Sequence, residues 1–555
     1  MSSLPLHYGI TRNLLLICIL FFQRTNSFCP SKCQCNVDHN LRVSCINAGL
    51  EVVPIQLNPD IKYINLTLNQ ILNVHFTLQF YTQLEELDLS KNKIDDLGSR
   101  NFDAQQQLKT VNLSRNSITH LKKDAFRGLK SLLLLDLSYN QITTIHLTAL
   151  HDLVGLIELN VAGNSIISMD DGIFRNMISL EILNFENNQL LDVPTENLMY
   201  TKKLRSLDLS GNFIEFVRND SFESLKHLSV LKITGNVVNE LDQRAFDGLL
   251  ELRTLNLADN NLTVVPTLQL SKLSNLSHLS MSGNCFTHLP PVALLNLFHL
   301  KELHLNRLDK LVKIDSRAFV DNTFLQTITL DDNPSFGDLP ARLFHGNPNL
   351  VEISMRGNDL RTLDAAQFPL DRLQRLYLSD NPLECNCSLL WLWRLTTGQH
   401  DEENTNTTNI LVLDKDKIGC DIWEERKIRR ILKTMSESEI KCPAHIVTII
   451  SAVMSILLVV MTGVSVLCYL RMVRKKKQAL AERKNVNKRV IPQPIDKLEL
   501  ERYLAAQEME HEYRALRPWE IPVNKLIEEP DHYEKFDDFR YDTRRSHKQP
   551  HVVYV

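Results

Sequence analysis

Apolar residues and a single asparagine recur at fixed spacing through most of the chain. The pattern is L-x-x-L-x-L-x-x-N, with conservative apolar replacements, and most intervals between successive asparagines are 24 residues. A further repeat fits at the right distance with Leu308 in place of the asparagine, so the pattern predicts fourteen repeats over residues 61–382. The asparagines of the other thirteen repeats are Asn69, Asn92, Asn116, Asn140, Asn164, Asn188, Asn212, Asn236, Asn260, Asn284, Asn333, Asn358 and Asn381.

The spacing within one repeat predicts a short strand with one buried side. In residues 204–212, Leu207 and Leu209 alternate along the strand and point inward, and stacked repeats then share one apolar core that no single repeat could form. Asn212 is expected to turn inward and satisfy backbone groups of the loop that leaves the strand. The predicted fold class is a leucine-rich-repeat solenoid, a curved parallel β-sheet with loops and short helices on its convex side.

The predicted concave sheet is long. Parallel strands stack at ~4.8 Å, so fourteen of them give a surface roughly 65 to 70 Å along the stacking direction. Such a surface is too extended for a catalytic cleft and suits another protein.

Cysteines cluster at both ends of the repeats. The first cluster, in residues 29–60, holds Cys29, Cys33, Cys35 and Cys45, and the second, in residues 383–443, holds Cys385, Cys387, Cys420 and Cys442. Each cluster is expected to cap one end of the solenoid, where the last strand would otherwise leave its backbone groups unpaired. Four cysteines allow three disulfide pairings, and zinc binding is the alternative, although a secreted chain favours disulfides. Cys285 lies outside both clusters and is left over.

Two apolar runs predict how the chain meets the membrane. Arg12 precedes the nine residues 14–22, which is the layout of a signal peptide at residues 1–28. Residues 446–470 carry no charge over 25 positions, and at ~1.5 Å per residue a helix there reaches roughly 37 Å, enough to cross a bilayer. Basic residues 471–477 follow this run, so the tail 471–555 is predicted to be cytoplasmic and the N-terminus extracellular, as in a single-pass type I plasma-membrane protein.

The charge balance differs on the two sides of the predicted span. Residues 29–445 carry 41 Lys and Arg against 51 Asp and Glu, a net charge of −10, and residues 471–555 carry 19 against 15, a net charge of +4. The acidic ectodomain argues against nucleic acid as a partner.

N-glycosylation sequons are spread over the predicted ectodomain. The candidate sites are Asn65, Asn112, Asn219, Asn261, Asn275 and Asn406, while Asn386, between two cap cysteines, is set apart from them. Asn65 and Asn112 occupy outward strand positions, so their glycans would stand on the concave face near its N-terminal end, which partners are then expected to avoid. The alternative is that asparagine is merely common there and the sequons go unused.

Outward strand and loop positions carry a mixed set of side chains with no stripe of one charge. The candidate partner contacts among them are Tyr139, Glu186, Arg307, Asp331, Arg356 and Tyr377. The alternative is an ordinary solvated face. The irregular repeat at residues 306–320 is either a bend that shapes a site or a drifted repeat.

The sequence shows no recognisable catalytic motif beside the repeats. The sequence has no glycine-rich phosphate loop and no H-E-x-x-H motif, so we expect no enzyme, no catalytic or metal-binding residues and no cofactor. The chain ends in Val553, Tyr554 and Val555, which resembles a ligand for a cytoplasmic PDZ protein, although a short apolar ending also arises by chance.

The cysteine clusters, the repeats and two further segments carry a resemblance that covers nearly the whole chain. Residues 364–373 (DAAQFPLDRL) lead into residues 385–391 (CNCSLLW), and the chain is similar to the insect Capricious/Tartan group of single-pass leucine-rich-repeat proteins. The cysteine caps of such proteins imply that the first cysteine pairs with the third and the second with the fourth. The resemblance also implies cell recognition, by adhesion or repulsion in cell sorting or axon guidance, with homophilic or teneurin-type partners. The alternative is a co-receptor that binds a soluble factor or an innate-immune ligand.

Overall fold

The computed structural model describes residues 29–36, 41–398, 411–423, 427–440, 444–486 and 502. Contacts divide the chain into two units, residues 1–444 and residues 445–555. Several predicted features lie outside the described residues, namely the signal peptide at 1–28, Asn406, Cys442, and Val553, Tyr554 and Val555 at the end of the tail.

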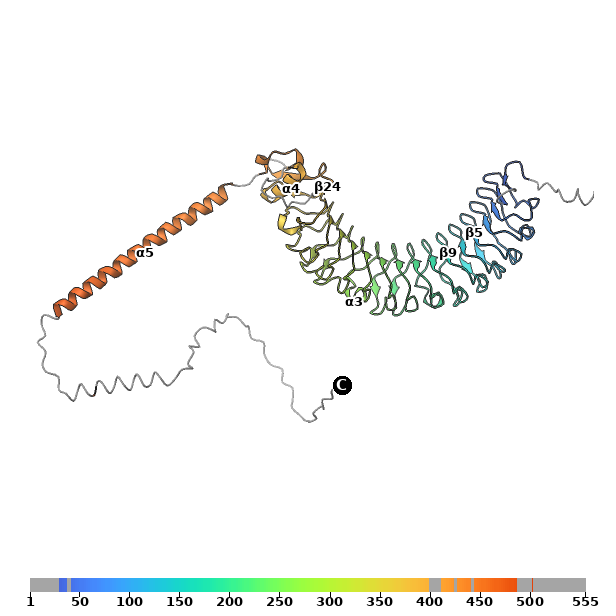
Figure 1. Cartoon of the computed structure of the whole chain (residues 1–555), viewed down its shortest axis with the longest axis horizontal. Helices are drawn as coiled ribbons and strands as arrows, with labels where there is room; N and C mark the ends of the chain where they lie inside the picture. The colour runs from blue at the N-terminus through green and yellow to red at the C-terminus, as the bar shows by residue number, and fades with distance from the viewer. Residues whose placement is uncertain are drawn as a thin grey trace, which may run out of the picture. The chain divides into compact units, whose positions relative to one another are not determined.

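The first unit is a leucine-rich-repeat solenoid built on a seventeen-stranded sheet (Figure 1). Each of the fourteen predicted repeats contributes one strand, and the strands pair in parallel in chain order, with identical register from one repeat to the next. The fourteen strands are β3 (Tyr63–Asn65), β4 (Glu86–Asp88), β5 (Thr110–Asn112), β7 (Leu134–Asp136), β9 (Glu158–Asn160), β10 (Ile182–Asn184), β11 (Ser206–Asp208), β13 (Val230–Lys232), β15 (Thr254–Asn256), β16 (His278–Ser280), β18 (Glu302–His304), β20 (Thr327–Thr329), β21 (Glu352–Ser354) and β22 (Arg375–Tyr377).

Further strands close the two ends of this sheet. At the N-terminal end, β1 (Gln34–Asn36) pairs antiparallel with β2 (Arg42–Ser44), which then joins β3 in parallel. At the C-terminal end, β24 (Leu411–Val412) pairs with β22. Beside it, the C-terminal cap combines helix α4 (Leu390–Thr397) with a small sheet of β23 (Leu383–Glu384), β25 (Gly419–Trp423) and β26 (Lys427–Ile431).

The opposite side of the solenoid consists of loops with short elements. Pairs of two-residue strands link neighbouring repeats, and the remaining elements are single turns of helix. These elements are β6 (His120–Leu121) with β8 (Thr144–Ile145), β12 (Phe216–Val217) with β14 (Glu240–Leu241), β17 (His288–Leu289) with β19 (Lys313–Ile314), α2 (Thr195–Leu198), α3 (Thr267–Leu270), η1 (Leu78–Phe80) and η2 (Ala365–Gln367). The single turns η3 (Cys387–Leu389), η4 (Leu432–Thr434) and η5 (Glu437–Glu439) belong to the C-terminal cap. Because these loops are bulkier than a strand spaced at ~4.8 Å, the stack curves with the sheet on the inner side (Figure 1).

One continuous apolar core fills the space between sheet and loops. Leu204, Leu207 and Leu209 have no exposed side-chain surface, as the spacing predicted. On the loop side, phenylalanines of successive repeats pack on one another, with the rings of Phe102 and Phe126 stacked 5.9 Å apart. Burial of this kind stabilises the solenoid by roughly 25 cal/mol for each Å² of apolar surface removed from water.

The repeat asparagines form a buried ladder of hydrogen bonds. Asn212 Nδ2 donates to the carbonyl oxygens of Leu209 in its own repeat and Phe185 in the preceding one, both at 3.0 Å. Asn212 Oδ1 accepts from the Leu190 amide at 2.9 Å. The predicted structural role of this asparagine is confirmed, and one side chain ties two consecutive loops together.

The repeat with Leu308 in place of asparagine stays in the stack. Its strand β18 pairs in register with β16 and β20, and Leu308 is fully buried. The Leu308 amide donates to Oδ1 of Asn333 at 2.7 Å, so the following repeat still provides the usual acceptor. The exception therefore does not interrupt the sheet.

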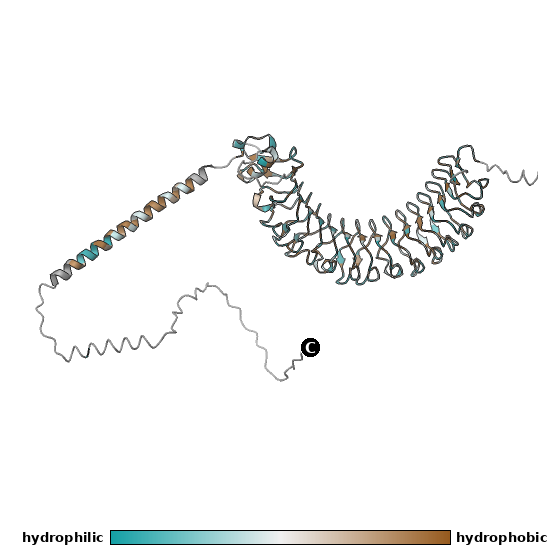
Figure 2. Ribbon diagram, viewed as in Figure 1, coloured by the Kyte–Doolittle hydropathy of each residue, from teal (hydrophilic) through white to brown (hydrophobic). Residues whose placement is uncertain are grey.

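The second unit contains helix α5 (Ala444–Val486). Within it, Ile449–Leu480 is long and apolar enough to cross a membrane, with a peak mean hydropathy of 2.5, and it is the one such helix among the described residues. Figure 2 shows apolar residues along most of this helix and polar ones toward its C-terminal end.

Candidate protein-binding surface

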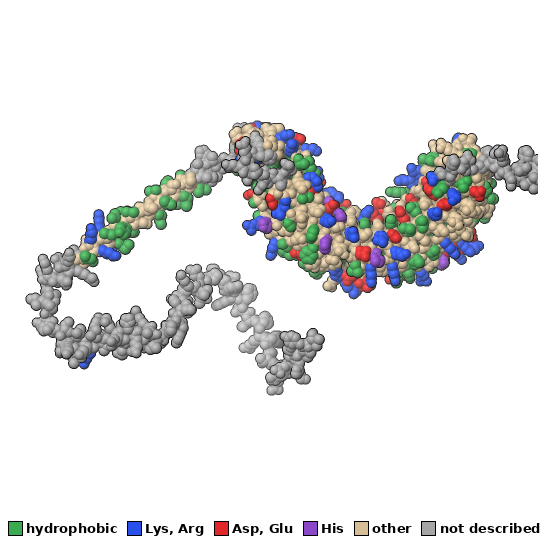
Figure 3. Space-filling view, in the orientation of Figure 1, with side chains coloured by type: hydrophobic (Ala, Val, Ile, Leu, Met, Phe, Trp, Pro, Cys, Tyr) green, Lys and Arg blue, Asp and Glu red, His purple; other side chains and the backbone are tan. Residues whose placement is uncertain are grey.

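The side of the solenoid seen in Figure 3 carries Lys and Arg interspersed with Asp and Glu. Along each strand the middle residue is buried and its two neighbours are more exposed, as in Tyr63, Ile64 and Asn65 of β3. The loop after each strand then turns through a residue with positive φ, for example Arg115, Tyr139 and Arg307. The exposed rows of strand and loop residues together form the candidate binding surface.

Tyr139 lies on this surface between Arg115 and Gly163, which occupy the same position in the preceding and the following repeat. The residue is 48% exposed, and the Arg115 guanidinium lies 4.3 Å from the centroid of the Tyr139 ring, within cation–π range. Gly163 occupies the same position of the next repeat, where a Cβ atom would lie 2.7 Å from Tyr139 Cδ1. Tyr139 is therefore held between a cation on one side and a repeat without a side chain on the other.

Arg307 is held by a partner two repeats earlier. Its Nη1 and Nη2 donate to the two carboxylate oxygens of Asp259 at 2.8 and 3.2 Å, and this pairing raises the pKa of Arg307. The pair borders an open polar pocket that also includes Asp309 and Asp332. The sequence reasoning missed Asp259, although its position in the repeat pattern is the same as that of Arg307.

Asp331, Arg356 and Tyr377 form one connected group. The Asp331 carboxylate accepts from Ser354 Oγ at 2.7 Å, from the Arg356 amide at 2.8 Å and from Arg356 Nη2 at 2.9 Å. The hydrogen bond to Asp331 raises the pKa of Arg356, whose guanidinium lies 5.0 Å from the centroid of the Tyr377 ring. Asp331 was placed among the outward residues, but it is buried, because its carboxylate turns back to position Arg356.

Glu186 stands apart from these groups. It is half-buried, and its Oε1 accepts from Asn187 Nδ2 at 3.3 Å. The six candidate contacts thus fall into a pair, Tyr139 and Glu186, in repeats four and six, and a set of four in repeats eleven to fourteen.

Ion pairs and apolar residues on the same face were also missed. Glu85 accepts from Lys62 at 2.8 Å and from Lys109 at 2.7 Å, and these two hydrogen bonds lower the pKa of Glu85 to about 2. Leu133 and Ile157 are about two-fifths exposed at outward positions where other repeats carry polar residues. The sequence did hold a signal for Leu133 and Ile157, because both are apolar at a repeat position that is polar in most other repeats.

The five described sequons of the candidate set are accessible to different degrees. Asn65 and Asn112 lie half-buried at the ends of β3 and β5, where each Oδ1 accepts from the amide two residues on, at 3.0 and 2.9 Å. Asn219, Asn261 and Asn275 are exposed. Asn386, which was set apart, uses its Oδ1 to cap η3 through the Ser388 amide at 3.0 Å.

The cysteines form three disulfides among the described residues, Cys29–Cys35, Cys33–Cys45 and Cys385–Cys420. The two N-terminal bonds follow the pairing that the family resemblance implied, and they leave no thiolates there for zinc. Cys387 lies in η3, and its expected partner Cys442 is outside the described residues. Cys285 is half-buried and is not part of a described disulfide.

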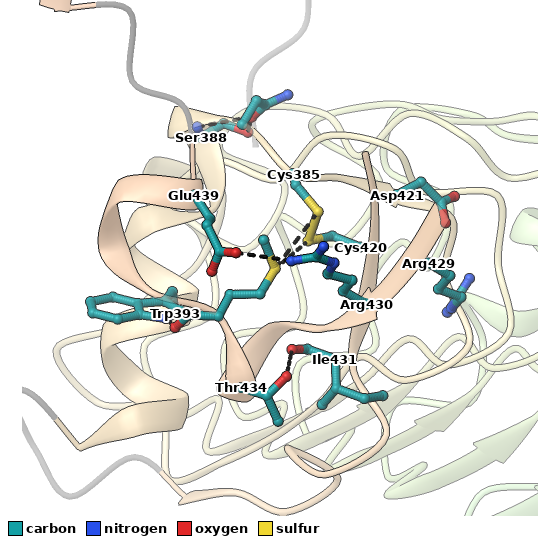
Figure 4. The surroundings of a disulfide bond; sticks show 12 residues. Cys385, Ser388, Trp393, Cys420, Asp421, Arg429, Arg430, Ile431, Thr434 and Glu439 are labelled. Atoms are coloured by element: carbon teal, nitrogen blue, oxygen red, sulfur yellow. Dashed lines mark hydrogen bonds and ion pairs between the residues drawn. A yellow bond between two sulfur atoms is a disulfide. The ribbon is translucent and has the colours of Figure 1, made fainter. Parts of the chain in front are cut away.

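The Cys385–Cys420 bond anchors the core of the C-terminal cap (Figure 4). Cys420 is fully buried, 3.6 Å from the Met435 sulfur. The indole nitrogen of Trp393 donates to the Met435 carbonyl at 2.9 Å, and Trp391 packs on Phe368 with ring centroids 5.1 Å apart. Both tryptophans therefore pack within the C-terminal cap, and Trp391 also contacts the last repeat.

In the part of the chain that the structure describes, no group of three or more His, Cys, Asp or Glu side chains has the geometry to hold a metal ion. The expectation that the chain is not an enzyme and needs no cofactor remains a prediction.

Comparison with known proteins agrees with the fold. The leucine rich repeat family model matches residues 106–166, 155–214, 202–262, 250–311 and 323–383. Leucine-rich repeat-containing protein 3 of Bos taurus is 38% identical over 104 residues, which cover 18% of this chain and 38% of that protein. The NT-3 growth factor receptor of Gallus gallus is 29% identical over 145 residues, covering 25% and 17%. Human oligodendrocyte-myelin glycoprotein is 32% identical over 94 residues, covering 17% and 21%.

These matches span well under half of each relative's length. Among solved structures, TLR13 in its complex with the RNA ssRNA13 gives a TM-score of 0.58 at 20% identity, over 71% of this chain and 63% of that one. Drosophila Toll in its complex with Spätzle gives 0.57 at 21% identity, over 73% and 62%. At such identities the likeness shows the fold alone.

The fold, the disulfides and the matched segments define the class: this is a leucine-rich-repeat protein with cysteine caps and one long apolar helix. The matched segments in the relatives are repeats and carry no enzymatic domain.

Proposed function

We propose that this chain is a cell-surface recognition receptor that binds protein partners through its concave sheet. The observation that carries the proposal is the curved sheet, to which fourteen repeats contribute one strand each and whose outward side chains are mixed in character (Figure 1). Solenoids use such surfaces to contact proteins over many repeats. The repeats lie on the N-terminal side of an apolar helix, so a membrane anchor would display them at the cell surface.

The proposed orientation is type I, with the repeats outside the cell. Basic residues at 471–477 follow the span, as is typical of a cytoplasmic flank. Disulfides at both ends of the repeats suit an oxidising compartment. In this orientation Asn65, Asn112, Asn219, Asn261, Asn275 and Asn406 are candidate glycosylation sites.

Within this class we propose a role in adhesion or repulsion between cells, as the resemblance to the Capricious/Tartan group implies. The partner would be a second copy of the chain or another surface receptor. The tail would then contact the cell interior through Val553, Tyr554 and Val555, bound by a PDZ domain that adds the tail as a strand.

A second candidate is a co-receptor for a soluble protein or an innate-immune ligand. Similarity to a chain named NT-3 growth factor receptor favours it, because that name describes binding of a soluble factor. Adhesion and ligand capture both use the same scaffold, so the fold does not choose between them.

A cell-mixing assay tests the proposal. Suspended cells that express the full chain, labelled in one colour, are mixed with unlabelled expressing cells and, separately, with cells that lack the chain. Clusters of expressing cells support homophilic adhesion, and mixed clusters support another surface receptor. If expressing cells show full surface staining but no clustering, adhesion is contradicted and the co-receptor function becomes the better account.

A further inference from the structure

Three adjacent repeats of the concave sheet combine an apolar centre with uncompensated acidic charge. Leu133, Ile157 and Ile182 are 41%, 38% and 39% exposed on repeats four, five and six. The Ile157 amide donates to the Leu133 carbonyl at 2.8 Å, and the Ile182 amide donates to the Ile157 carbonyl at 3.0 Å. Leu133 and Ile157 directly precede β7 and β9, and Ile182 is the first residue of β10, in register with Glu158. The three residues therefore lie on adjacent backbone segments of consecutive repeats.

Two apolar residues in succession at the position of Leu133 and Ile157 occur only in repeats four and five among the described repeats, although Val351 is a single apolar residue at the same position further along the sheet. The position of Leu133 and Ile157 carries a polar or charged residue in the repeats on either side of them, Lys62, Glu85 and Lys109 before and Glu181, Arg205, Ser229 and Arg253 after. Contiguous exposed apolar side chains on a soluble surface typically mark an interaction site.

The charge around the apolar centre is of one sign. The outward residues within 133–139, 157–163 and 181–187 include four acids and no lysine or arginine, and these acids are Asp136, Glu158, Glu181 and Glu186. Only Glu181 has an ion-pair partner among the described residues, Arg205 at 3.2 Å.

Several cations on the flanking repeats are already engaged. Lys109 pairs with Glu85 at 2.7 Å, and Arg115 lies over the Tyr139 ring. Lys232 pairs with Asp208 at 3.1 Å. Among the residues that the structure describes, the carboxylates of Asp136, Glu158 and Glu186 on repeats four to six therefore have no ion-pair partner.

We propose that the outward face of repeats four to six, which we call the central patch, is the docking site for a protein surface with apolar side chains ringed by lysine and arginine. The proposal rests on the proposed function and specifies where on the sheet it resides. Apolar side chains at the centre would exclude water, and Asp136, Glu158 and Glu186 would pair with the basic rim. Tyr139 and Glu186 belong to this patch, whereas Arg307, Asp331, Arg356 and Tyr377 lie outside it.

The central patch also adjoins a predicted glycan. Asn112 at the end of β5 is the register partner of Asp136 in β7. A glycan on Asn112 would therefore limit the patch on its N-terminal side, so a bound partner would extend toward the later repeats.

The test uses a phage library of random twelve-residue peptides, selected on cells that display the full chain. The anchor variant Ile157→Thr/Ile182→Thr keeps a β-branched side chain at both positions and removes most of their apolar surface. Its matched control, Val230→Thr/Val351→Thr, makes the same kind of change at the corresponding positions of repeats eight and thirteen. A charge variant, Glu158→Lys/Glu186→Lys, reverses the rim, and all variants must reach wild-type surface levels.

We expect the enriched peptides to contain an apolar residue flanked by lysine or arginine. Their affinity should fall about tenfold or more on the anchor and charge variants, stay unchanged on the control, and weaken with added salt. Enrichment of neutral or acidic peptides, no enrichment at all, or equal binding to the anchor variant and the wild type would each overturn the proposal.

The same variants separate this proposal from the proposed function. If cells expressing the anchor variant cluster as strongly as wild-type cells, adhesion stands and the central patch is not its site. If wild-type cells do not cluster but basic peptides still bind the patch, adhesion fails while the docking site stands.

Discussion

Arg307 reaches across an entire repeat to hold Asp259. The guanidinium donates two hydrogen bonds, at 2.8 and 3.2 Å, to a carboxylate 48 residues earlier. Gly283 occupies the same loop position in the repeat between them, with a φ of +65°. A Cβ atom there would lie 2.1 Å from Asp259 Oδ1, so this glycine makes room for the carboxylate.

Replacing Gly283 by alanine should therefore disturb both the backbone and the ion pair. The positive φ alone costs about 1 kcal/mol for alanine, and displacement of Asp259 adds to it. Gly235→Ala is the matched control, because its φ is +66° but the nearest atom to a Cβ is 3.7 Å away. Hydrogen exchange of amides in repeats nine to eleven should accelerate more in Gly283→Ala than the corresponding region does in Gly235→Ala, and equal effects would contradict the role of Gly283.

The asparagine ladder predicts a large local loss of stability at Asn212. Asn212→Ala leaves the carbonyl oxygens of Phe185 and Leu209 and the Leu190 amide without their buried partner. Since each unsatisfied buried group costs about 1–3 kcal/mol, we expect a loss of at least ~2 kcal/mol. Urea denaturation of the solubilised full chain would measure it.

Asn239→Ala provides the comparison for Asn212. Asn239 is exposed, and its side chain bonds to Glu215 Oε1 at 3.1 Å on the surface. We expect a loss below ~0.5 kcal/mol for this variant. A loss at Asn212 no greater than that at Asn239 would mean that the ladder contributes little.

Acid should weaken the N-terminal repeats through Glu85. Hydrogen bonds from Lys109 and Lys62 lower the pKa of Glu85 to about 2, whereas an unfolded glutamate titrates near ~4.3. A carboxylate with a lowered folded-state pKa contributes its full stabilisation above the unfolded pKa and loses it as the pH falls toward the folded one. The contribution of the Lys62–Glu85–Lys109 group should therefore disappear between about pH 4.3 and about pH 2.

Thermal unfolding of wild type and Glu85→Gln across this pH range provides the measurement. The wild type should unfold at the higher temperature near pH 6, and the two midpoints should converge as the pH approaches ~2. Glu86→Gln is the control, because Glu86 is exposed and has no ion pair among the described residues. A gap between wild type and Glu85→Gln that persists at ~pH 2 would show that the ion pairs are not its cause.

The C-terminal cap should depend on its disulfide. Cys385→Ser/Cys420→Ser removes a bond whose loss typically costs about 2–5 kcal/mol, and it loosens the packing around Met435 and Trp393. We expect a several-fold drop in surface level, measured by flow cytometry of cells expressing the tagged full chain.

Cys285→Ser is the matched control for the disulfide, because Cys285 is not part of a described disulfide. Its surface level should equal that of the wild type. An equal drop in both variants would point to a general effect of cysteine loss, and no drop in either would contradict the role of the bond.

The local pattern of the sequence decided the fold because each repeat satisfies the same requirements with the same residues. The spacing of Leu204, Leu207 and Leu209 alone predicts which side chains are buried, since alternation along a strand fixes inward and outward positions. The asparagine role followed for the same reason, because a buried amide must bond to whatever backbone lies beside it.

The local pattern could not predict which side chains of different repeats contact one another. Cysteine spacing left three pairings open in each cap, and only the folded caps show Cys33 beside Cys45 and Cys385 beside Cys420. Asp331 occupied an outward position in the pattern, yet it is buried against Ser354 and Arg356, because the next strand places a guanidinium within reach.

The sequence by itself determined the solenoid, its fourteen strands and the residues of its core, because period and polarity act within one repeat. Only the tertiary structure decided which side chains meet on the concave face. The reach of Arg307 to Asp259 and the contact of Ile157 with its neighbours on either side depend on the stacking of strands at ~4.8 Å, which brings together residues 24 to 48 positions apart.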